Sequence, residues 1–302
     1  MLNKLLHLLF PNPFDQTIKK AAIQNKTRFL VIWNRGLGDI PLGLYALIFR
    51  TRSWIPQAKI TFLTRKDLAP AFSMLEGVDV LTAPHWERGR SLDIKATLEG
   101  QGLSLDVFDV ILDKFDPTRS FKWQLNHLIP KLKWKDEWDL CAQKFDLNSE
   151  KKCIGVHIQT ETQKYYGYEK NWPLSSWKCL FEKIREKQKK DIVLFGMERA
   201  SPFLMDGVID LRGRTTLFDA LALIKTRCSH LIVPDSGILS LIYYLDASFP
   251  LQVISLWSDP KQGVLRQNVP SPNLGLNHIP LIAKDGQLAH LSVDDVFAAL
   301  CR

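Results

Sequence analysis

The stretch from residue 28 to residue 50 constrains the fold of this chain more than any other. It opens with an unbroken apolar run, 29–33, which has the length of one buried parallel strand. A turn with Gly36 and Gly38 follows, and from Ile40 onward apolar residues recur at helical spacing. Strand, glycine turn and helix together form the opening unit of a Rossmann-like sheet, in which ligands bind at the carboxyl ends of the strands.

Asp39 closes this turn, and two interpretations of it stay open. Asp is favoured at helix N-caps and Pro41 suits a first helical turn, so the pattern is typical of a cap. The alternative is a catalytic base at the mouth of a ligand cleft. The stretch by itself favours the cap, and the rest of the chain has to decide between the two.

The remainder of the chain alternates strand and helix patterns in two successive sets. Strands are predicted at 29–33, 58–64, 78–81 and 108–113 in the first set, and at 152–158, 191–196, 208–211, 230–234 and 251–257 in the second. Helices are predicted at 67–75, 217–225, 238–245 and 292–300, with another that begins near Trp172. The alternation predicts two Rossmann-like α/β domains, 1–148 and 149–302, with the cleft between them as the default ligand site.

The charge and cysteine content narrow the classes of partner and of cellular compartment. The 40 basic and 32 acidic residues give a formal charge of +8, which favours an anionic partner such as a nucleotide, an acidic lipid or nucleic acid. Five scattered cysteines without a CxxC pair argue against a disulfide framework and fit a reducing cytoplasm. Because no HExxH or similar spacing occurs among the seven histidines, we predict no zinc site.

Residues 1–14 do not have the pattern of a secretory signal peptide. His7 interrupts the apolar run, Pro11 ends it, and no small-residue cleavage site follows. No later segment has the apolar length of a membrane span. The apolar side chains of this stretch fit either an interfacial face beside Lys4 or a first helix that docks on the domain. We expect a cytoplasmic protein, compatible with peripheral association with a membrane surface.

Gly36 and Gly38 also resemble part of a dinucleotide-binding fingerprint. The third glycine position holds Pro41, and the second strand is followed by Arg65 and Lys66 instead of an acid. Basic residues there would suit a 2′-phosphate, so an NADP-dependent reductase remains an alternative.

Two further stretches follow predicted strands and can bind anions. Asp235-Ser236-Gly237 places an acid, a hydroxyl and a glycine where a helix begins, which fits an anion site or a plain N-cap. The loop 157–173 contains Thr160 and Lys170, which can contact phosphate, although most loop lysines are solvated. The basic and aromatic segment 114–138 fits a nucleic-acid surface or, more commonly, half-buried aromatic rings.

Taken together, three motifs resemble the family-nine glycosyltransferases. This family contains the ADP-heptose–lipopolysaccharide heptosyltransferases and has the GT-B fold, which consists of two Rossmann-like domains with a cleft between them. The resemblance extends from about Arg28 to about Gly263. The matching pieces, in chain order, are Asn34-Arg35-Gly36-Leu37-Gly38-Asp39, Lys170-Asn171-Trp172-Pro173 with Trp177, and Pro234-Asp235-Ser236-Gly237.

The resemblance implies an inverting sugar transfer that needs no metal ion or other cofactor. It implies that the C-terminal domain binds a nucleotide-sugar donor, with ADP-heptose favoured, and that the acceptor is lipopolysaccharide core or a related lipid-linked or oligosaccharide glycan. In the first domain, the resemblance implies Asp39 as the catalytic base and Arg35, Gly36 and Gly38 as a loop near the acceptor. In the second domain, it implies Thr160 and Lys170 as a diphosphate clamp and Glu198 as a nucleoside contact. It further implies Asp235 as a sugar contact, and Ser236 and Gly237 as phosphate contacts.

One departure from the family pattern keeps a second function open. The family places histidine five residues after the acid of the third motif, where this chain has Ser240. A degenerate member that binds a nucleotide or a glycan without transfer is therefore an alternative to the enzyme. We expect no nucleic-acid partner.

Overall fold

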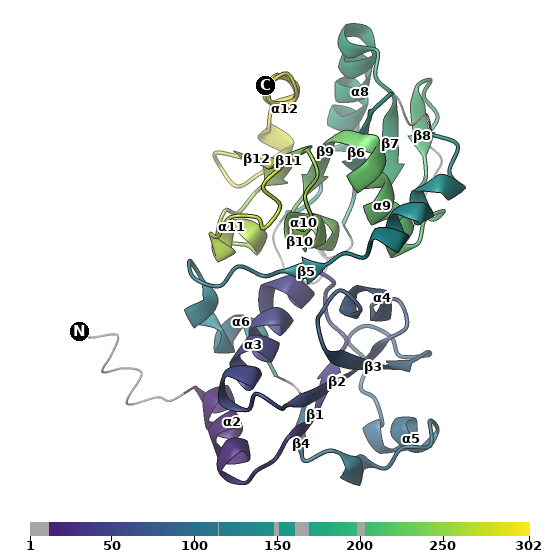
Figure 1. Ribbon diagram of the computed structural model, residues 1–302. Helices are drawn as coiled ribbons and strands as arrows, with labels where there is room; N and C mark the ends of the chain where they lie inside the picture. The colour runs from purple at the N-terminus through teal and green to yellow at the C-terminus, as the bar shows by residue number, and fades with distance from the viewer. Residues whose placement is uncertain (1–11, 114, 148–150, 161–168, 198–202) are drawn as a thin grey trace, which may run out of the picture. The chain divides into compact units, whose positions relative to one another are not determined.

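The computed structural model describes residues 12–113, 115–147, 151–160, 169–197 and 203–302 (Figure 1). The chain divides into two compact units, Met1–Leu132 and Lys133–Arg302, and each contains a parallel sheet with helices around it. No helix in the described ranges is long and apolar enough to cross a membrane.

The first unit contains a four-stranded parallel sheet in the order β3-β2-β1-β4. Its strands are β1 (Arg28–Trp33), β2 (Lys59–Arg65), β3 (Val78–Ala83) and β4 (Val110–Leu112). Its helical elements are α2 (Pro13–Ile23), η1 (Ile40–Leu44), α3 (Tyr45–Trp54), α4 (Ala69–Phe72), α5 (Ile94–Glu99), η2 (Leu105–Val107), α6 (Pro117–Ser120) and η3 (Lys122–Gln124). The predicted strands of this unit are therefore present, and β1 lies in the interior of the sheet, as its unbroken apolar run predicts.

The helix predicted from Ile40 onward begins as a π-helix, η1, before it continues as α3. The Tyr45 N–H donates to the Ile40 carbonyl, which is the wider spacing of a π-helix. The side-chain amide of Gln124 donates to the Leu42 carbonyl at 2.7 Å, so a carbonyl of η1 is hydrogen-bonded by a residue that is distant in the sequence. A side chain at Gly43 would place its Cβ 2.7 Å from Cβ of Pro117, which makes glycine necessary at this close approach.

The second unit contains a six-stranded parallel sheet in the order β12-β11-β9-β6-β7-β8. Its strands are β6 (Cys153–His157), β7 (Ile192–Phe195), β8 (Val208–Asp210), β9 (Cys228–Pro234), β11 (Leu251–Trp257) and β12 (Leu276–Ile282), with the short strands β5 (Leu132–Lys133) and β10 (Leu245–Asp246) outside this sheet. Its helical elements are η4 (Asp136–Lys144), α8 (Leu174–Gln188), α9 (Leu217–Arg227), α10 (Gly237–Tyr243), α11 (Gly263–Gln267), η5 (Leu288–His290) and α12 (Val293–Leu300). On one face of the sheet, α8 and α12 cover the alternating apolar side chains of β6.

Strand β12 was not predicted, because its pattern differs from that of the interior strands. It lies at the edge of the sheet beside β11 and contains Asn277, His278 and Pro280. Its residues are mostly half-buried or exposed, so it has no continuous apolar run. Proline is tolerated there because an edge strand does not need every ladder hydrogen bond.

The division between the units falls before the boundary predicted at residue 148. The stretch just before that boundary, η4, packs on α9 of the second unit. The rings of Trp138 and Phe218 stack with centroids 4.3 Å apart, and the Lys225 ammonium lies 2.6 Å from the Asp139 carboxylate. These contacts join the stretch to the second unit, and they involve partners that only the tertiary structure brings together.

The aromatic residues of segment 114–138 are engaged in packing. In the first unit, Phe121 is fully buried and contacts Phe14 and Phe115, with ring centroids 4.9 and 5.2 Å apart. In the second unit, the ring of Trp134 packs edge-on against the ring of Trp138, with centroids 5.3 Å apart. The segment therefore follows the interpretation of buried and half-buried rings instead of that of a base-stacking surface.

Each of the two parallel sheets reverses its strand order at its own first strand. In the first unit β1 lies between β2 and β4, and in the second unit β6 lies between β7 and β9. In open α/β sheets, ligands bind outside the carboxyl ends of the strands at such a reversal. The residues that follow β1 and β4 in the first unit, and β6 and β9 in the second, are therefore the first places to look for a site.

Candidate functional site

At the reversal of the second sheet, Lys170 and Asp235 form a buried ion pair. Asp235 directly follows β9, and Lys170 lies in the segment that leads into α8. The Lys170 ammonium is 2.7 Å from Asp235 Oδ2, and the two side chains are only 8% and 9% exposed. The interpretation of Lys170 as a solvated loop charge is therefore wrong, because this lysine is held inside the protein by a carboxylate.

The next residue, Ser236, is the N-cap of α10. Its hydroxyl accepts the N–H of Leu239 at 3.2 Å, and Gly237 is the first residue of the helix. Capping and charge pairing are thus divided between Ser236 and Asp235. Ser240 is buried one turn later, and its hydroxyl donates to the Ser236 carbonyl at 3.2 Å.

Thr160 is tied to the segment that carries Lys170. The Thr160 N–H donates to the Asn171 side-chain oxygen at 2.8 Å, and the Asn171 amide donates back to the Thr160 carbonyl at 3.3 Å. Trp172 and Trp177 pack edge-on in the core with centroids 4.9 Å apart, and the Trp172 indole donates to the Leu291 carbonyl. The tryptophans of this motif therefore anchor the segment, and the polar residues beside them line the end of the sheet.

Glu169 also holds the segment that carries Lys170 in place. Its carboxylate accepts the Leu288 N–H at 2.8 Å, and its carbonyl accepts a hydrogen bond from the hydroxyl of Ser258, just after β11. The residue directly before Lys170 is thus bonded both to the loop after β11 and to the first residue of η5. No pattern in the sequence singled out Glu169, because its partners lie far along the chain.

Gly263, which begins α11, leaves room for Asp235. A Cβ atom there would lie 2.5 Å from Asp235 Oδ1 and 2.8 Å from the ring of Trp257, and the residue has φ +50°. Both the space and the left-handed backbone favour glycine. In the sequence, Gly263 marks only the end of the family resemblance and has no assigned role.

His157 is a further buried polar group at the carboxyl end of β6. Burial lowers the pKa of its imidazole to about 4, so the ring is neutral at pH 7. Its Nδ1 is buried, and within the described ranges it has no hydrogen-bond partner. The sequence did not distinguish it from an ordinary core histidine in a strand.

At the reversal of the first sheet, the Asp39 carboxylate stabilises the glycine turn. Its Oδ2 accepts the Gly36 N–H at 3.0 Å, and it makes no side-chain capping bond to η1. Asp39 therefore occupies the N-cap position of η1, but its carboxylate turns back toward the preceding loop and does not cap the helix. The side chain is only partly buried, so solvent reaches the residue.

Arg35 lies in the same turn, between an aromatic ring and an acid. Its guanidinium is 5.6 Å from the centroid of the Trp33 ring and 3.7 Å from the carboxylate of Asp116, which follows β4. The ion pair therefore connects the residues that follow β1 with those that follow its neighbour β4. Gly36 and Gly38 belong to this loop, as the motif places them.

The surroundings of Arg65 count against the NADP alternative. Arg65 is 9% exposed, its guanidinium makes two bonds to Asp67 at 2.9 and 2.7 Å, and a third bond goes to the Asn34 carbonyl at 2.8 Å. A guanidinium engaged in this way stabilises the protein and does not present a free fork to a 2′-phosphate.

The predicted site residues thus fall into two groups. The second unit brings together Thr160, Lys170, Asp235, Ser236 and Gly237, and the first unit brings together Arg35, Gly36, Gly38 and Asp39. The predicted nucleoside contact Glu198 lies outside the described residues. Within the described ranges, no three His, Cys, Asp or Glu side chains gather to hold a metal ion.

Comparison with solved structures gives the same architecture. A family-nine glycosyltransferase from Veillonella parvula DSM 2008 aligns with 91% of this chain and 96% of its own at a TM-score of 0.59 and 16% identity. The E. coli heptosyltransferase WaaC with ADP aligns with 91% of this chain and 99% of its own at a TM-score of 0.53 and 13% identity. WaaC with ADP-2-deoxy-2-fluoro heptose gives a TM-score of 0.51 at 15% identity, with the same coverage.

No family model matches the sequence, and no curated protein matches it. The likeness is therefore one of fold, and it confirms the predicted fold class, an α/β protein that resembles the GT-B glycosyltransferases in having two Rossmann-like units.

Proposed function

We propose that this protein is a glycosyltransferase that moves a sugar from a nucleotide-sugar donor to a bacterial glycan. The observation that carries the proposal is the buried Lys170–Asp235 ion pair at the reversal of the second sheet. A cation buried there is suited to the phosphates of a donor, because ligands of such sheets bind at this position. The fold shared with glycosyltransferases supports the reaction class.

We propose that Lys170 and Asp235 divide the donor between them. The lysine would bind a diphosphate oxygen, and the carboxylate, which accepts hydrogen bonds, would bind a hydroxyl of the sugar. Thr160, Ser236 and Gly237 would contact the phosphates, and Glu198 the nucleoside. ADP-heptose is the favoured donor, since a structural neighbour holds ADP and a fluorinated ADP-heptose.

Asp39 is proposed as the base that accepts the proton of the acceptor hydroxyl. Its carboxylate makes no capping bond to η1, and one of its oxygens accepts the Gly36 N–H, which supports a carboxylate fixed on its loop. Arg35, Gly36 and Gly38 would form the wall of the acceptor site. The ligand cleft between two domains stays a prediction.

The proposed transfer is inverting and needs no metal ion. With one base, the acceptor oxygen attacks the anomeric carbon from the side opposite the leaving diphosphate, and the configuration inverts. The sugar becomes oxocarbenium-like while charge builds on the diphosphate, and a lysine held in a buried site stabilises that charge. Undiminished transfer in excess EDTA is the expected result, and an absolute requirement for an added divalent cation would contradict this part.

The acceptor is proposed to be lipopolysaccharide core or a related lipid-linked or oligosaccharide glycan, and the protein to work at the cytoplasmic face of the inner membrane. The formal charge of +8 supports attraction to an anionic surface or glycan. Sedimentation with vesicles that contain acidic lipid, compared with neutral vesicles, tests the association.

The first experiment is a thermal-shift series with ADP-, UDP-, GDP- and CMP-sugars, followed by turnover assays with whichever donor stabilises the protein. A ligand that binds only the native state raises its melting temperature, so the donor class is identified before the acceptor is known. Stabilisation by none of the four nucleotide classes would overturn the proposal.

A second candidate function, binding without transfer, is favoured by Ser240. Its hydroxyl is committed to the Ser236 carbonyl inside α10, where the related family has histidine. Donor binding without turnover against any glycan acceptor, followed by gain of transfer in Ser240→His, would support this candidate.

A further inference from the structure

Two buried thiols face each other at the amino-terminal edge of the second sheet. Cys153 is the first residue of β6 and Cys228 the first residue of β9, and they are paired directly across these neighbouring parallel strands. Their sulfur atoms are 3.6 Å apart. This edge is opposite to the carboxyl ends of the same strands, where Lys170 and Asp235 meet, so the proposed function does not use these thiols.

The spacing suits a disulfide. Neighbouring strands lie roughly 4.8 Å apart, which is inside the Cα separation of about 4.4–6.8 Å found in disulfides. Bond formation shortens the distance between the sulfur atoms from 3.6 Å to about 2.05 Å. The register of the two strands shifts just after Cys153, and such an irregularity interrupts the regular ladder at the pair.

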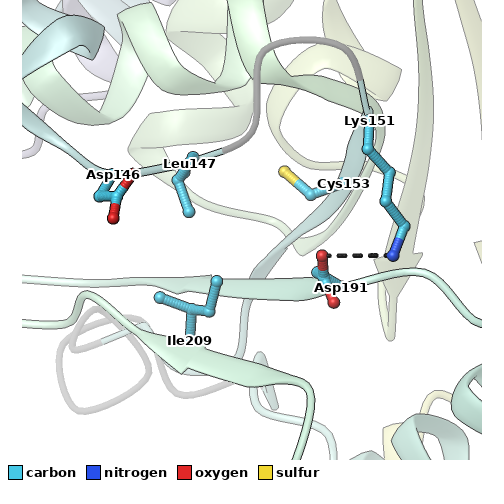
Figure 2. Close-up of a pocket in the computed structure, with 6 residues that line it drawn as sticks. All are labelled: Asp146, Leu147, Lys151, Cys153, Asp191 and Ile209. Carbon is cyan, nitrogen blue, oxygen red and sulfur yellow. Dashed lines mark ion pairs between the residues drawn. The ribbon is translucent and has the colours of Figure 1, made fainter.

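The two thiols differ in their access to solvent. Cys153 lines a cavity of about 490 Å³ together with Leu147, Lys151, Asp191 and two further residues, and Figure 2 shows its sulfur directed into this space. Cys228 is not among the lining residues. Cys153 is therefore the more accessible of the two thiols to a small reagent in this cavity, since Cys228 is 1% exposed and does not line it.

The pKa values of the two thiols also favour Cys153 as the residue that reacts first. The hydrogen bond with Cys228 holds the pKa of the Cys153 thiol below its ordinary value, despite burial. The same hydrogen bond, together with complete burial, raises the pKa of Cys228. Because the thiolate is the nucleophile in disulfide exchange, Cys153 is the residue that attacks.

We propose that Cys153 and Cys228 are a thiol-modification site, at which a small-molecule disulfide oxidises the pair to an intramolecular disulfide. In the first step the Cys153 thiolate attacks one sulfur of the reagent, forms a mixed disulfide and releases one thiolate, which takes up the proton that Cys153 lost. In the second step the Cys228 sulfur attacks Cys153 Sγ, and the other half of the reagent takes up the proton of Cys228 as it leaves, so that it departs as a thiol. The two cysteines are oxidised and the reagent is reduced to two thiols.

The test uses the full-length protein with Cys141, Cys179 and Cys301 changed to serine, because Cys179 and Cys301 are exposed and would react on their own. Hydroxyethyl disulfide, which is small and uncharged, is the oxidant. Native mass spectrometry after treatment should show the loss of two hydrogens and no retained adduct. Peptide mapping should then link the segment that contains Cys153 to the one that contains Cys228, and dithiothreitol should reverse the change.

Two single variants in this background test the order of the steps. Cys228→Ser should retain one hydroxyethylthio group on Cys153, because nothing resolves the mixed disulfide. Cys153→Ser should retain at least tenfold less adduct under the same treatment, because Cys228 does not line the cavity. Circular dichroism before and after treatment checks that both variants are folded.

Three results would overturn the proposal. One is a pair that reacts only after urea unfolds the chain. Another is equal adduct on the two single variants, which would mean that the cavity gives Cys153 no preference. The third is a stable adduct on Cys153 while Cys228 is present, which would show that the native strands hold the sulfur atoms apart.

Discussion

Lys170→Met is the variant whose effect the structure determines best. The lysine and Asp235 lie 2.7 Å apart with less than a tenth of either side chain exposed. At this separation and an effective dielectric constant of about 20, the gross attraction is about 6 kcal/mol (332 divided by 20 and by 2.7). Desolvation of both groups offsets much of it, but removing one partner of a buried ion pair costs about 3–5 kcal/mol.

We therefore expect Lys170→Met to lower the free energy of unfolding by about 3–5 kcal/mol. In a thermal scan this corresponds to a loss of roughly 6–20 °C for a unit of this size. The double variant Lys170→Met/Asp235→Asn removes both charges with little change of volume and should recover most of the loss. Lys151→Met is the matched control, because its 3.5 Å pair with Asp191 is about half exposed and should cost about 0–1 kcal/mol.

Binding of ADP separates the structural role of the pair from its proposed functional role. Isothermal titration well below the melting temperature should show Lys170→Met binding ADP roughly 10- to 150-fold more weakly, which is the loss of a charged hydrogen bond. Asp235→Asn should bind ADP more tightly, because the lysine no longer shares its charge, but should bind the complete nucleotide sugar no better than the unchanged protein. ADP affinity that is equal in all three proteins would remove Lys170 from the donor site.

A coupling energy between the two substitutions tests the energetic argument itself. Residues in one ion pair show non-additive effects, so the double variant should be more stable than the sum of the single effects predicts by about 3 kcal/mol or more, at the top of the usual range for residues in contact. A coupling energy near zero would refute the reasoning, because it would mean that solvent screens the pair in spite of its burial.

Three further predictions follow from other residues. Asp39→Asn should keep the fold and the donor affinity while transfer falls roughly 10²–10⁴-fold, the usual effect of losing a general base; an unchanged kcat would contradict the proposed base. Gly263→Ala should reduce both thermal stability and donor affinity, since its Cβ would approach Asp235 Oδ1 to 2.5 Å, and wild-type values for both would show that the space is not tight. Burial raises the pKa of Asp210, but hydrogen bonds from Arg212 and the backbone outweigh this effect and hold the pKa at about 2, below the unfolded value of about 3.9. A lowered pKa stabilises the fold above pH 4 and ceases to do so as pH falls through 2, so acid denaturation followed by fluorescence should be shallower in Asp210→Asn.

Local patterns in the sequence were sufficient for the type of fold. Strands such as β1, β6 and β11 are buried on both faces, so they appear as unbroken apolar runs that need no knowledge of their neighbours. The turn around Asp39 and the loop after β9 were placed at carboxyl ends of strands for the same reason. Each signal lies within a few adjacent residues, which is the range over which propensity and periodicity act.

Only the tertiary structure decided which groups act on one another. In the sequence, Lys170 looks like a solvated loop lysine. In the structure it is buried because it pairs with Asp235, which directly follows β9. Asp39 has the sequence pattern of a cap, yet its carboxylate accepts the N–H of Gly36 in the preceding loop. The helix that follows begins as the π-helix η1, whose Leu42 carbonyl accepts a hydrogen bond from the side chain of Gln124, far along the chain. Cys153 and Cys228 are scattered in the sequence and face each other only through strand order. Pairing energies of this kind depend on separation and burial, and these are set by contacts between residues that are far apart in the chain.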